Sequence, residues 1–134
     1  MQDNTTYRSY DWGNKVILIA EDQKINFVLL KAIFERTKAT VIWAQDGEAA
    51  VESFLNTDHI DLVIMDYMMP KLNGVEATRL IKEQRQSIPV IFHSANPLEE
   101  DEDIEMMSYD DIAYFQKPVN AAQLLNKVED LLKA

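Results

Sequence analysis

The sequence contains no cysteine and has two histidines, His59 and His93, among its 134 residues. The absence of cysteine excludes disulfides, thiol catalysis and cysteine-based zinc or iron–sulfur sites. A zinc site would need carboxylates to complete its ligand set, and we do not expect one. No apolar run is long enough to span a bilayer, and the polar N-terminus lacks a signal-peptide pattern. We therefore expect a cytoplasmic protein without membrane insertion.

Positive charge is also scarce, since 13 Lys and Arg residues face 23 Asp and Glu residues and the formal net charge is -10. The resulting field repels nucleic acid phosphates and anionic membranes, so we expect no direct binding of nucleic acid. This field suits a divalent cation or a basic partner, although an acidic surface also simply keeps a small protein in solution. The length and the hydrophobic share of 47% fit one globular domain with a core.

Apolar runs and helical periodicities alternate five times along the chain. The runs predict strands at 15–20, 40–44, 62–65, 89–92 and 112–116. Apolar residues at helical spacing predict a helix after each strand. In the first helix these residues are Ile25, Val28, Leu29, Ala32 and Ile33. Asn120 is predicted to cap the last helix. The acidic segment 98–111 predicts a weakly anchored, solvated helix.

This alternation predicts an α/β fold in which helices cover both faces of a parallel sheet. Five βα units with a buried first strand fit a flavodoxin-like, doubly wound sheet of five strands and five helices. The expected strand order is 2-1-3-4-5, although alternation alone does not prove it. We place the domain at residues 15–134. Residues 1–14 are interpreted as an N-terminal tail or linker whose last aromatic residues pack on the domain.

Polar residues stand where the predicted strands end, namely Glu21-Asp22, Asp66, Ser94 and, after the last strand, Lys117. The carboxyl ends of parallel strands meet at one edge of the sheet, where ligands bind. Three carboxylates there repel one another unless a cation compensates, and oxygen ligands suit Mg²⁺. With Mg²⁺, the lysine and the hydroxyl would form a clamp for a phosphoryl group. Asp66 would then be the nucleophile that forms an aspartyl phosphate.

A series of motifs accompanies these residues in the same order as in a known family. The motifs are Glu21-Asp22, Asn26-x-x-Leu29-Leu30, Asp46-Gly47-x-x-Ala50, Met65-Asp66-x-x-Met69-Pro70-x-x-Asn73-Gly74, Ser94-Ala95 and Lys117-Pro118. Over residues 15–133 the chain resembles a receiver domain of a two-component response regulator or of a hybrid histidine kinase. The resemblance implies a phosphorelay signalling domain that modifies itself, rather than a turnover enzyme. Its partner would be a histidine kinase or a histidine phosphotransfer domain.

The resemblance also implies a role for each residue of the site. Asp66 would accept the phosphoryl group from a phosphohistidine. Asp22 would bind Mg²⁺ directly and Glu21 through water, together with Asp66 and the backbone carbonyl of Met68. Lys117 would hold a phosphoryl oxygen. Pro118 would shape that loop through a Lys–Pro bond that is usually cis in the family.

A conformational switch is implied as well. Ser94, which stands where threonine is frequent, would move towards the phosphoryl group, and Tyr114 would turn inward behind it. The face formed by the fourth helix, fifth strand and fifth helix would shift between two states and could support a phosphorylation-dependent dimer. We expect segment 98–111 to change most. An apolar Met68 would position attacking water poorly and predicts slow self-dephosphorylation, which Asn96 would also tune.

Simpler interpretations exist for individual residues. Glu21-Asp22 could cap the first helix, Ser94 could cap the next one, and Tyr114 and Trp43 could serve packing alone. His93 is interpreted as an edge residue near the site and His59 as a solvated loop residue.

Other functions are possible for the domain as a whole, the first being an interaction module that is never phosphorylated. A haloacid-dehalogenase-like phosphatase would need a second acid at Met68, and a flavodoxin-type electron carrier would need a phosphate loop where Glu21-Asp22 stands. No output domain is recognised, so we expect a stand-alone regulator or a receiver from a larger protein, with a hybrid kinase favoured.

Overall fold

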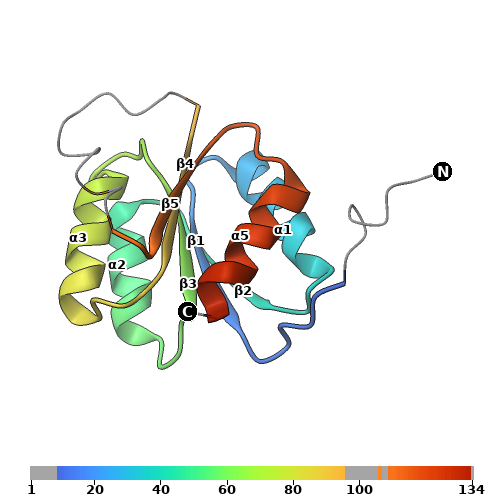
Figure 1. Ribbon diagram of the computed structural model, residues 1–134. Coiled ribbons are helices and arrows are strands. Elements are labelled where there is room, and N and C mark those ends of the chain that lie inside the picture. Colours follow the sequence, from blue (N-terminus) through green and yellow to red (C-terminus); the bar gives the residue numbers. More distant parts are fainter. Residues whose placement is uncertain (1–8, 96–105, 107–108, 134) are drawn as a thin grey trace.

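The computed structural model describes residues 9–95, 106 and 109–133, which form a five-stranded sheet with the order β2-β1-β3-β4-β5 (Figure 1). Every neighbouring pair of strands is parallel. The predicted fold class and strand order are therefore confirmed. The strands are β1 (Val16–Ala20), β2 (Thr40–Ala44), β3 (Leu62–Asp66), β4 (Val90–Ser94) and β5 (Ile112–Gln116), and the helices are α1 (Lys24–Glu35), α2 (Gly47–Asn56), α3 (Gly74–Gln84) and α5 (Ala121–Lys133).

The described residues contain four of the five predicted helices. The remaining helix was predicted within segment 98–111, and most of that segment, like Asn96, lies outside the described residues. Within the segment, Met106 is described and is buried. No helix among the described residues is long and apolar enough to cross a membrane.

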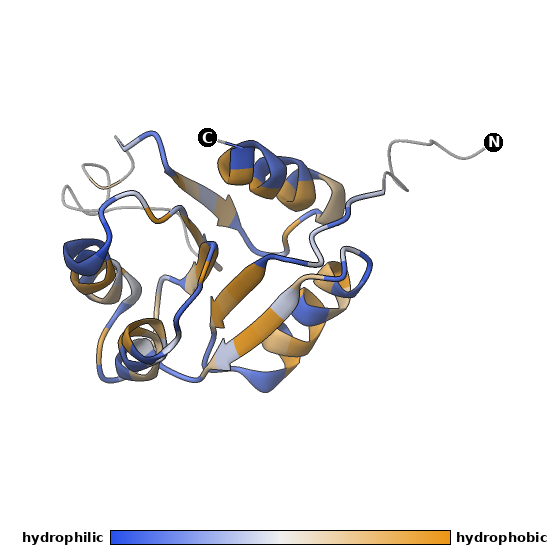
Figure 2. Cartoon of the chain, turned by 90° about the horizontal axis from the view of Figure 1, so that it is seen from below, coloured by the Kyte–Doolittle hydropathy of each residue, from blue (hydrophilic) through white to orange (hydrophobic). Residues whose placement is uncertain are grey.

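Two cores cover the two faces of the sheet, because side chains along a strand point alternately to opposite faces. Helices α1 and α5 pack on one face over Ile17, Ile64 and Ile91. Helices α2 and α3 pack on the other over Leu18 and Met65. Figure 2 shows largely hydrophobic strands between helices that carry both hydrophobic and hydrophilic residues. The sheet thus divides the domain into an α1/α5 side and an α2/α3 side.

The face of α1 that packs on the sheet differs from the apolar stripe seen in the sequence. The buried residues are Phe27, Leu30 and Phe34, whereas Ile25 and Leu29 are 65% and 59% exposed. The helix itself is confirmed, but much of the apolar stripe from Ile25 faces outward. This helix is apolar on most of its circumference, so periodicity alone could not decide which face the sheet would cover.

Polar side chains define where α2, α3 and α5 begin. Asp46 accepts a hydrogen bond from the backbone of Ala49 at 2.8 Å, and Asn120 accepts one from Gln123 at 3.0 Å. Asn73 forms a reciprocal capping box with Glu76 at the start of α3. These caps satisfy amide groups that have no partner within the helix. The predicted cap of the last helix is confirmed.

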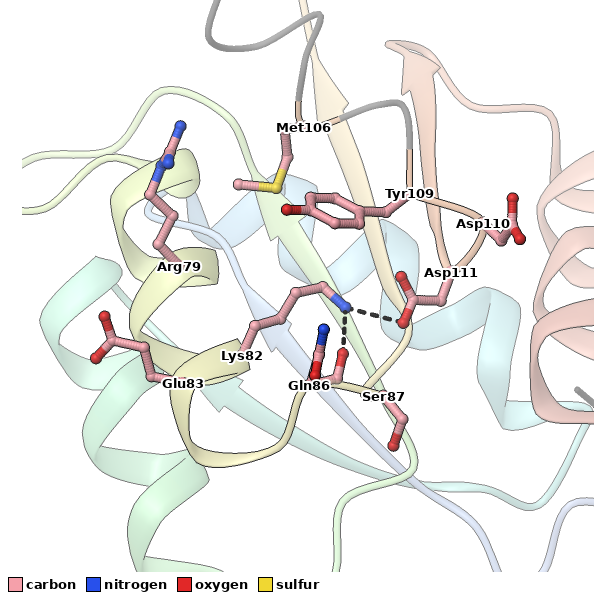
Figure 3. A pocket seen from close by; sticks show the side chains of 9 residues that line it. All are labelled: Arg79, Lys82, Glu83, Gln86, Ser87, Met106, Tyr109, Asp110 and Asp111. Carbon is pink, nitrogen blue, oxygen red and sulfur yellow. Dashed lines mark hydrogen bonds and ion pairs between the residues drawn. The ribbon is translucent and has the colours of Figure 1, made fainter.

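Lys82 ties the C-terminal end of α3 to the loop that precedes β5 (Figure 3). Its Nζ donates to the backbone oxygens of Gln86 and Ile88 at 3.0 and 2.8 Å and to Asp111 Oδ2 at 3.0 Å. These residues lie in or beside a cavity of about 790 Å³ that contains none of the predicted site residues. We assign this lysine a structural role, because a largely buried ammonium satisfies two backbone carbonyls and one carboxylate.

The aromatic residues before β1 pack on the domain as expected. Tyr10 and Trp12 are buried on the α1/α5 side of the core, and their rings lie 4.8 Å apart. The hydroxyl of Tyr10 donates to Asn126 Oδ1 in α5. The backbone amide of Trp12 donates to the carbonyl of Thr37 at 2.8 Å.

Candidate functional site

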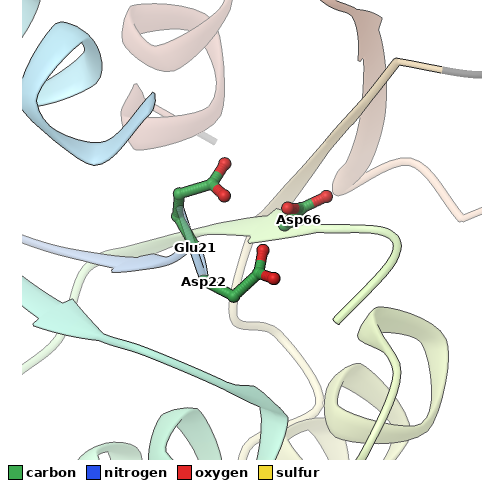
Figure 4. A group of neighbouring side chains, drawn as sticks. All are labelled: Glu21, Asp22 and Asp66. Carbon is green, nitrogen blue, oxygen red and sulfur yellow. The ribbon is translucent and has the colours of Figure 1, made fainter. Parts of the chain in front are cut away.

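The carboxyl ends of β1 and β3 bring three acidic side chains together, as the order of the strands predicts. Glu21 and Asp22 follow β1 directly, and Asp66 is the last residue of β3. One ligand atom from each lies within 4.8 Å of the others (Figure 4). Glu21 and Asp66 are buried, with 0% and 4% of their surfaces exposed. Neither acidic residue of β1 caps α1, because Gln23 stands at the cap position without a side-chain hydrogen bond.

Lys117 enters the same pocket from the end of β5. Its Nζ lies 3.0 Å from Glu21 Oε1 and 3.4 Å from Asp66 Oδ2. The backbone amide of Lys117 donates to the carbonyl of Ser94 at 2.7 Å, and this bond fixes the loop against β4. The Lys117–Pro118 peptide bond is cis, as the resemblance implied. Among the described residues, Lys117 brings one ammonium to a group of three carboxylates, so this part of the pocket carries an excess of negative charge.

This excess shows in the protonation of Asp66. Burial, together with the charge of Glu21, raises the pKa of the Asp66 carboxyl to about 7, although Lys117 opposes the shift. A carboxyl group with such a pKa is poorly stabilised in its ionised form. A bound cation would stabilise that form.

The donor set fits a divalent magnesium ion. Carboxylates are the hard oxygen ligands that Mg²⁺ prefers, and Mg²⁺ usually takes only a few of them from the protein. The backbone amide of Met68 donates to Asp66 Oδ1 at 3.3 Å, and the Met68 side chain is 60% exposed at the mouth of the site. Metal binding by the Met68 carbonyl remains a prediction.

Tyr114 and, by strand alternation, Ser94 lie on the α2/α3 side of the sheet. Ile64 and Asp66 alternate onto the α1/α5 side, while Phe92 and Tyr114 pack on the α2/α3 side. Ser94, two residues after Phe92, shares that second side. Burial raises the pKa of the Tyr114 hydroxyl, and a side-chain hydrogen bond with Ser94 lowers it. The two predicted switch residues are therefore in direct contact, although no movement is described.

Gly74 allows the start of α3 to pack against the end of β3. A Cβ atom at this position would lie 2.3 Å from the backbone oxygen of Asp66, much closer than van der Waals contact permits. The amide of Gly74 also donates to the carbonyl of Tyr67 at 3.0 Å. The glycine thus holds the segment after Asp66 against the sheet.

Two residues of the site were given simpler roles in the sequence analysis. Trp43 was interpreted as packing, and its ring does stack on Phe27 with centroids 4.5 Å apart. Its Nε1 also donates to the Glu21 carbonyl at 2.8 Å. His93 was interpreted as an edge residue, but it is 2% exposed and its Nε2 lies 3.8 Å from Glu21 Oε1.

The burial of His93 on the α1/α5 side could have been predicted from the sequence. This residue stands two positions after Ile91 in a predicted buried strand, and such spacing places both side chains on one face. His59 is exposed, as expected, and its Nε2 lies 2.7 Å from Asp61 Oδ2.

A doubly wound parallel sheet with a lysine and three carboxylates at its carboxyl edge defines a receiver-like class of domain. Comparison with known proteins agrees, since the model of the response regulator receiver domain family matches residues 17–129. This chain belongs to the response regulator receiver domain family and is thus a domain of two-component signalling.

Individual relatives come from regulators and from sensor kinases. The chain is 35% identical over 121 residues to the transcriptional regulatory protein CpxR of Escherichia coli, with 90% of this chain and 50% of CpxR covered. It is 34% identical over 112 residues to the autoinducer 2 sensor kinase/phosphatase LuxQ of Vibrio vulnificus, with 84% of this chain and 13% of LuxQ covered. The chain therefore spans half or less of these relatives.

A solved structure of a sensor kinase receiver shares the fold. The receiver domain of the sensor histidine kinase PA1611 from Pseudomonas aeruginosa matches with a TM-score of 0.78 and 28% identity, covering 90% of this chain and 98% of that chain. In that structure a magnesium ion is coordinated in the active-site cleft.

Proposed function

We propose that this domain accepts a phosphoryl group on Asp66 from a phosphohistidine of a histidine kinase or phosphotransfer protein. The observation that carries the proposal is the pocket in which Glu21, Asp22 and Asp66 face one ammonium group, that of Lys117. A cation bound in this pocket would increase the share of Asp66 that is ionised and can act as the nucleophile. Once a cation is bound, it favours the charged form of the carboxyl.

In the reaction, a carboxylate oxygen of Asp66 attacks phosphorus and forms a new P–O bond. The P–N bond to the donor imidazole breaks, and the imidazole nitrogen leaves with the electron pair and takes a proton from solvent. Glu21, Asp22 and Asp66 would hold Mg²⁺, which neutralises charge on the phosphoryl oxygens when bound. Lys117, already 3.4 Å from Asp66 Oδ2, would bind a phosphoryl oxygen. The product is an acyl phosphate on the domain itself.

An exposed apolar surface beside the pocket supports a protein as the donor. Ile25, Val28 and Leu29 lie on one face of α1 and are 65%, 45% and 59% exposed. Leu29 also lines a cavity of about 480 Å³ together with Lys117 and Pro118. Clustered apolar side chains at a surface are typical of interaction sites. We assign this α1 surface to the partner that carries the phosphohistidine.

The Ser94–Tyr114 contact supports a conformational response. Movement of Ser94 towards the phosphoryl group would break its hydrogen bond with Tyr114 and release the ring. Because Tyr114 belongs to β5, the change would reach the face on which we expect a phosphorylation-dependent dimer. Size measurement with light scattering, with and without the phosphoryl mimic beryllium fluoride, tests this dimer.

Intact-mass spectrometry after incubation with a small acyl phosphate and Mg²⁺ tests the chemistry. We expect the gain of one phosphoryl group, which is lost in Asp66→Asn and in metal-free samples. The exposed control Asp58→Asn should behave as wild type. No gain with any donor would contradict the proposal and favour an unphosphorylated interaction module.

The α1 surface has a separate test. Ile25→Ser and Leu29→Ser should slow transfer from a phosphorylated histidine protein and leave the reaction with a small acyl phosphate unchanged. Leu55→Ser is the matched control, because this residue is 55% exposed on α2. Equal rates for all variants with the protein donor would count against this surface.

A further inference from the structure

His93 is a buried polar residue of the pocket that the proposed reaction does not use. It lies beside Asp66 in the register of β3 and β4. Since Ile64 and Ile91 both pack on the α1/α5 side, Asp66 and His93, two residues further on, share that side. The His93 imidazole therefore belongs to the same half of the site as Glu21 and Lys117.

The Nε2 atom of His93 has no hydrogen-bond partner among the described residues. It lies 3.8 Å from Glu21 Oε1, which is too far for a hydrogen bond but close enough for a small movement to form one. A buried polar atom without a partner is uncommon and destabilises the state in which it occurs. Nε2 would gain a partner in a state of the site that frees a nearby acceptor.

Glu21 Oε1 would lose its present donor, Lys117 Nζ, after phosphorylation. The side chain is fully buried, at 0% exposed. Its Oε2 accepts from the backbone amide of Gln23 at 2.9 Å, and its Oε1 accepts from Lys117 Nζ at 3.0 Å. A phosphoryl group on Asp66 brings new anionic oxygens to Lys117, whose ammonium then turns away from Glu21. A buried carboxylate oxygen that loses its donor is strongly destabilising.

We propose that His93 is a positioning residue. When Lys117 turns to the phosphoryl group, the Nε2–H of His93 donates a hydrogen bond to Glu21 Oε1 in its place. The inference rests on the proposed function of Asp66. An oxygen of Glu21 can accept a hydrogen bond from the imidazole tautomer that carries the proton on Nε2. This exchange of donors frees Lys117 to bind a phosphoryl oxygen, while the Glu21 side chain stays in position to hold the metal.

The role needs only the neutral form of the imidazole, which carries one N–H donor. A neutral donor satisfies the carboxylate without competing with the metal or the lysine for negative charge. A second lysine at this position would add a charge that the phosphorylated pocket would have to accommodate.

The chain is well suited to a direct test by NMR, because it has two histidines. Long-range ¹H–¹⁵N spectra report which ring nitrogen carries the proton, and exposed His59 serves as an internal reference. We expect His93 to carry its proton on Nε2 in all states. Addition of Mg²⁺ and beryllium fluoride should make this proton exchange slowly and shift downfield. A proton on Nδ1 throughout, or no change with the mimic, would overturn the proposal.

Kinetic variants test the consequence of losing the donor. His93→Leu removes it at similar volume, and we expect phosphorylation by a small acyl phosphate to slow about tenfold, as for the loss of one hydrogen bond to a charged group. His93→Gln keeps an N–H donor and should return the rate to within about threefold of wild type. Equal rates for Leu and wild type, or no rescue by Gln, would refute the role.

A third variant separates this inference from the proposed function. In Lys117→Met the donor to Glu21 Oε1 is absent without any phosphorylation, so the protected Nε2–H signal of His93 should appear in the apo protein. If it appears while wild type takes no phosphoryl group, the exchange of donors is supported and the proposed function fails. If wild type is phosphorylated and the signal is absent from Lys117→Met, the exchange is refuted and the function stands.

Discussion

Replacement of Asp66 by asparagine should stabilise the metal-free domain, although it abolishes the proposed chemistry. The pKa of the Asp66 carboxyl rises from 3.8 to about 7 on folding, with burial as the main cause. The folded state therefore binds this proton more tightly than the unfolded state does. The stabilisation that comes from this tighter proton binding is fully present below about pH 4 and is lost as the pH rises to about 7.

The magnitude follows from the same difference. At about 1.4 kcal/mol for each pKa unit, ionisation of Asp66 costs the folded state up to about 4 kcal/mol above pH 7. The variant also loses the contact with Lys117 Nζ at 3.4 Å, which offsets part of the gain. We expect a net stabilisation of about 2 kcal/mol at pH 8. For a domain of this size it raises Tm by about 8 °C.

Thermal unfolding of wild type and Asp66→Asn at pH 5 and pH 8, with and without Mg²⁺, is the assay. The difference in Tm should be large at pH 8, small at pH 5, and reduced by millimolar Mg²⁺, which compensates the wild-type carboxylate. Asp58→Asn, at an exposed position, should leave Tm within about 1 °C. An equal gain at both pH values, or no effect of Mg²⁺, would refute the electrostatic reasoning.

Three further predictions concern other parts of the domain. Lys82→Met should lower the free energy of unfolding by about 2 kcal/mol, because Lys82 bonds two carbonyls and Asp111. The control Lys133→Met, at an exposed position, should change it little. Urea titration measures both variants, and equal effects would contradict the role of Lys82. Met68→Asn should hydrolyse the acyl phosphate severalfold faster by positioning water, so an unchanged decay of the phosphorylated mass would refute this role. Because Trp43 donates to the Glu21 carbonyl, Mg²⁺ should change its fluorescence in a Trp12→Phe background, and a flat titration would contradict this link.

The position of the site could be predicted from the sequence because it depends on where buried strands end. Asp66 and Lys117 follow apolar runs, and parallel strands bring such ends to one edge whatever their separation along the chain. The same logic placed Glu21-Asp22. The turn after Asp66 was also predictable, since Asn73-Gly74 carries both a helix cap and a residue without Cβ.

The outward face of α1 could not be predicted, because both stripes of this helix are apolar. Phe27 and Leu30 pack on the sheet, while Ile25 and Leu29 stay exposed, and only the position of the helix over β1 and β2 decides between them. The contact of His93 with the pocket could have been predicted from strand alternation. That His93 Nε2 lacks a hydrogen-bond partner among the described residues could not be predicted, because it depends on interatomic distances, which the periodicity of a sequence does not give.

The division of the domain by its sheet has a consequence for how mutations will sort. By strand alternation Asp66 and His93 follow Ile64 and Ile91 onto the α1/α5 side. Ser94 follows Phe92 onto the α2/α3 side, where Tyr114 also packs. The sheet thus separates the residues of the proposed reaction from Tyr114, which would respond to it. Backbone bonds such as that from Lys117 to Ser94 connect the two at the carboxyl ends of the strands. Substitutions on the α1/α5 side should mainly alter the rate at which Asp66 is phosphorylated. Substitution of Tyr114 on the α2/α3 side should mainly alter the conformational response to phosphorylation.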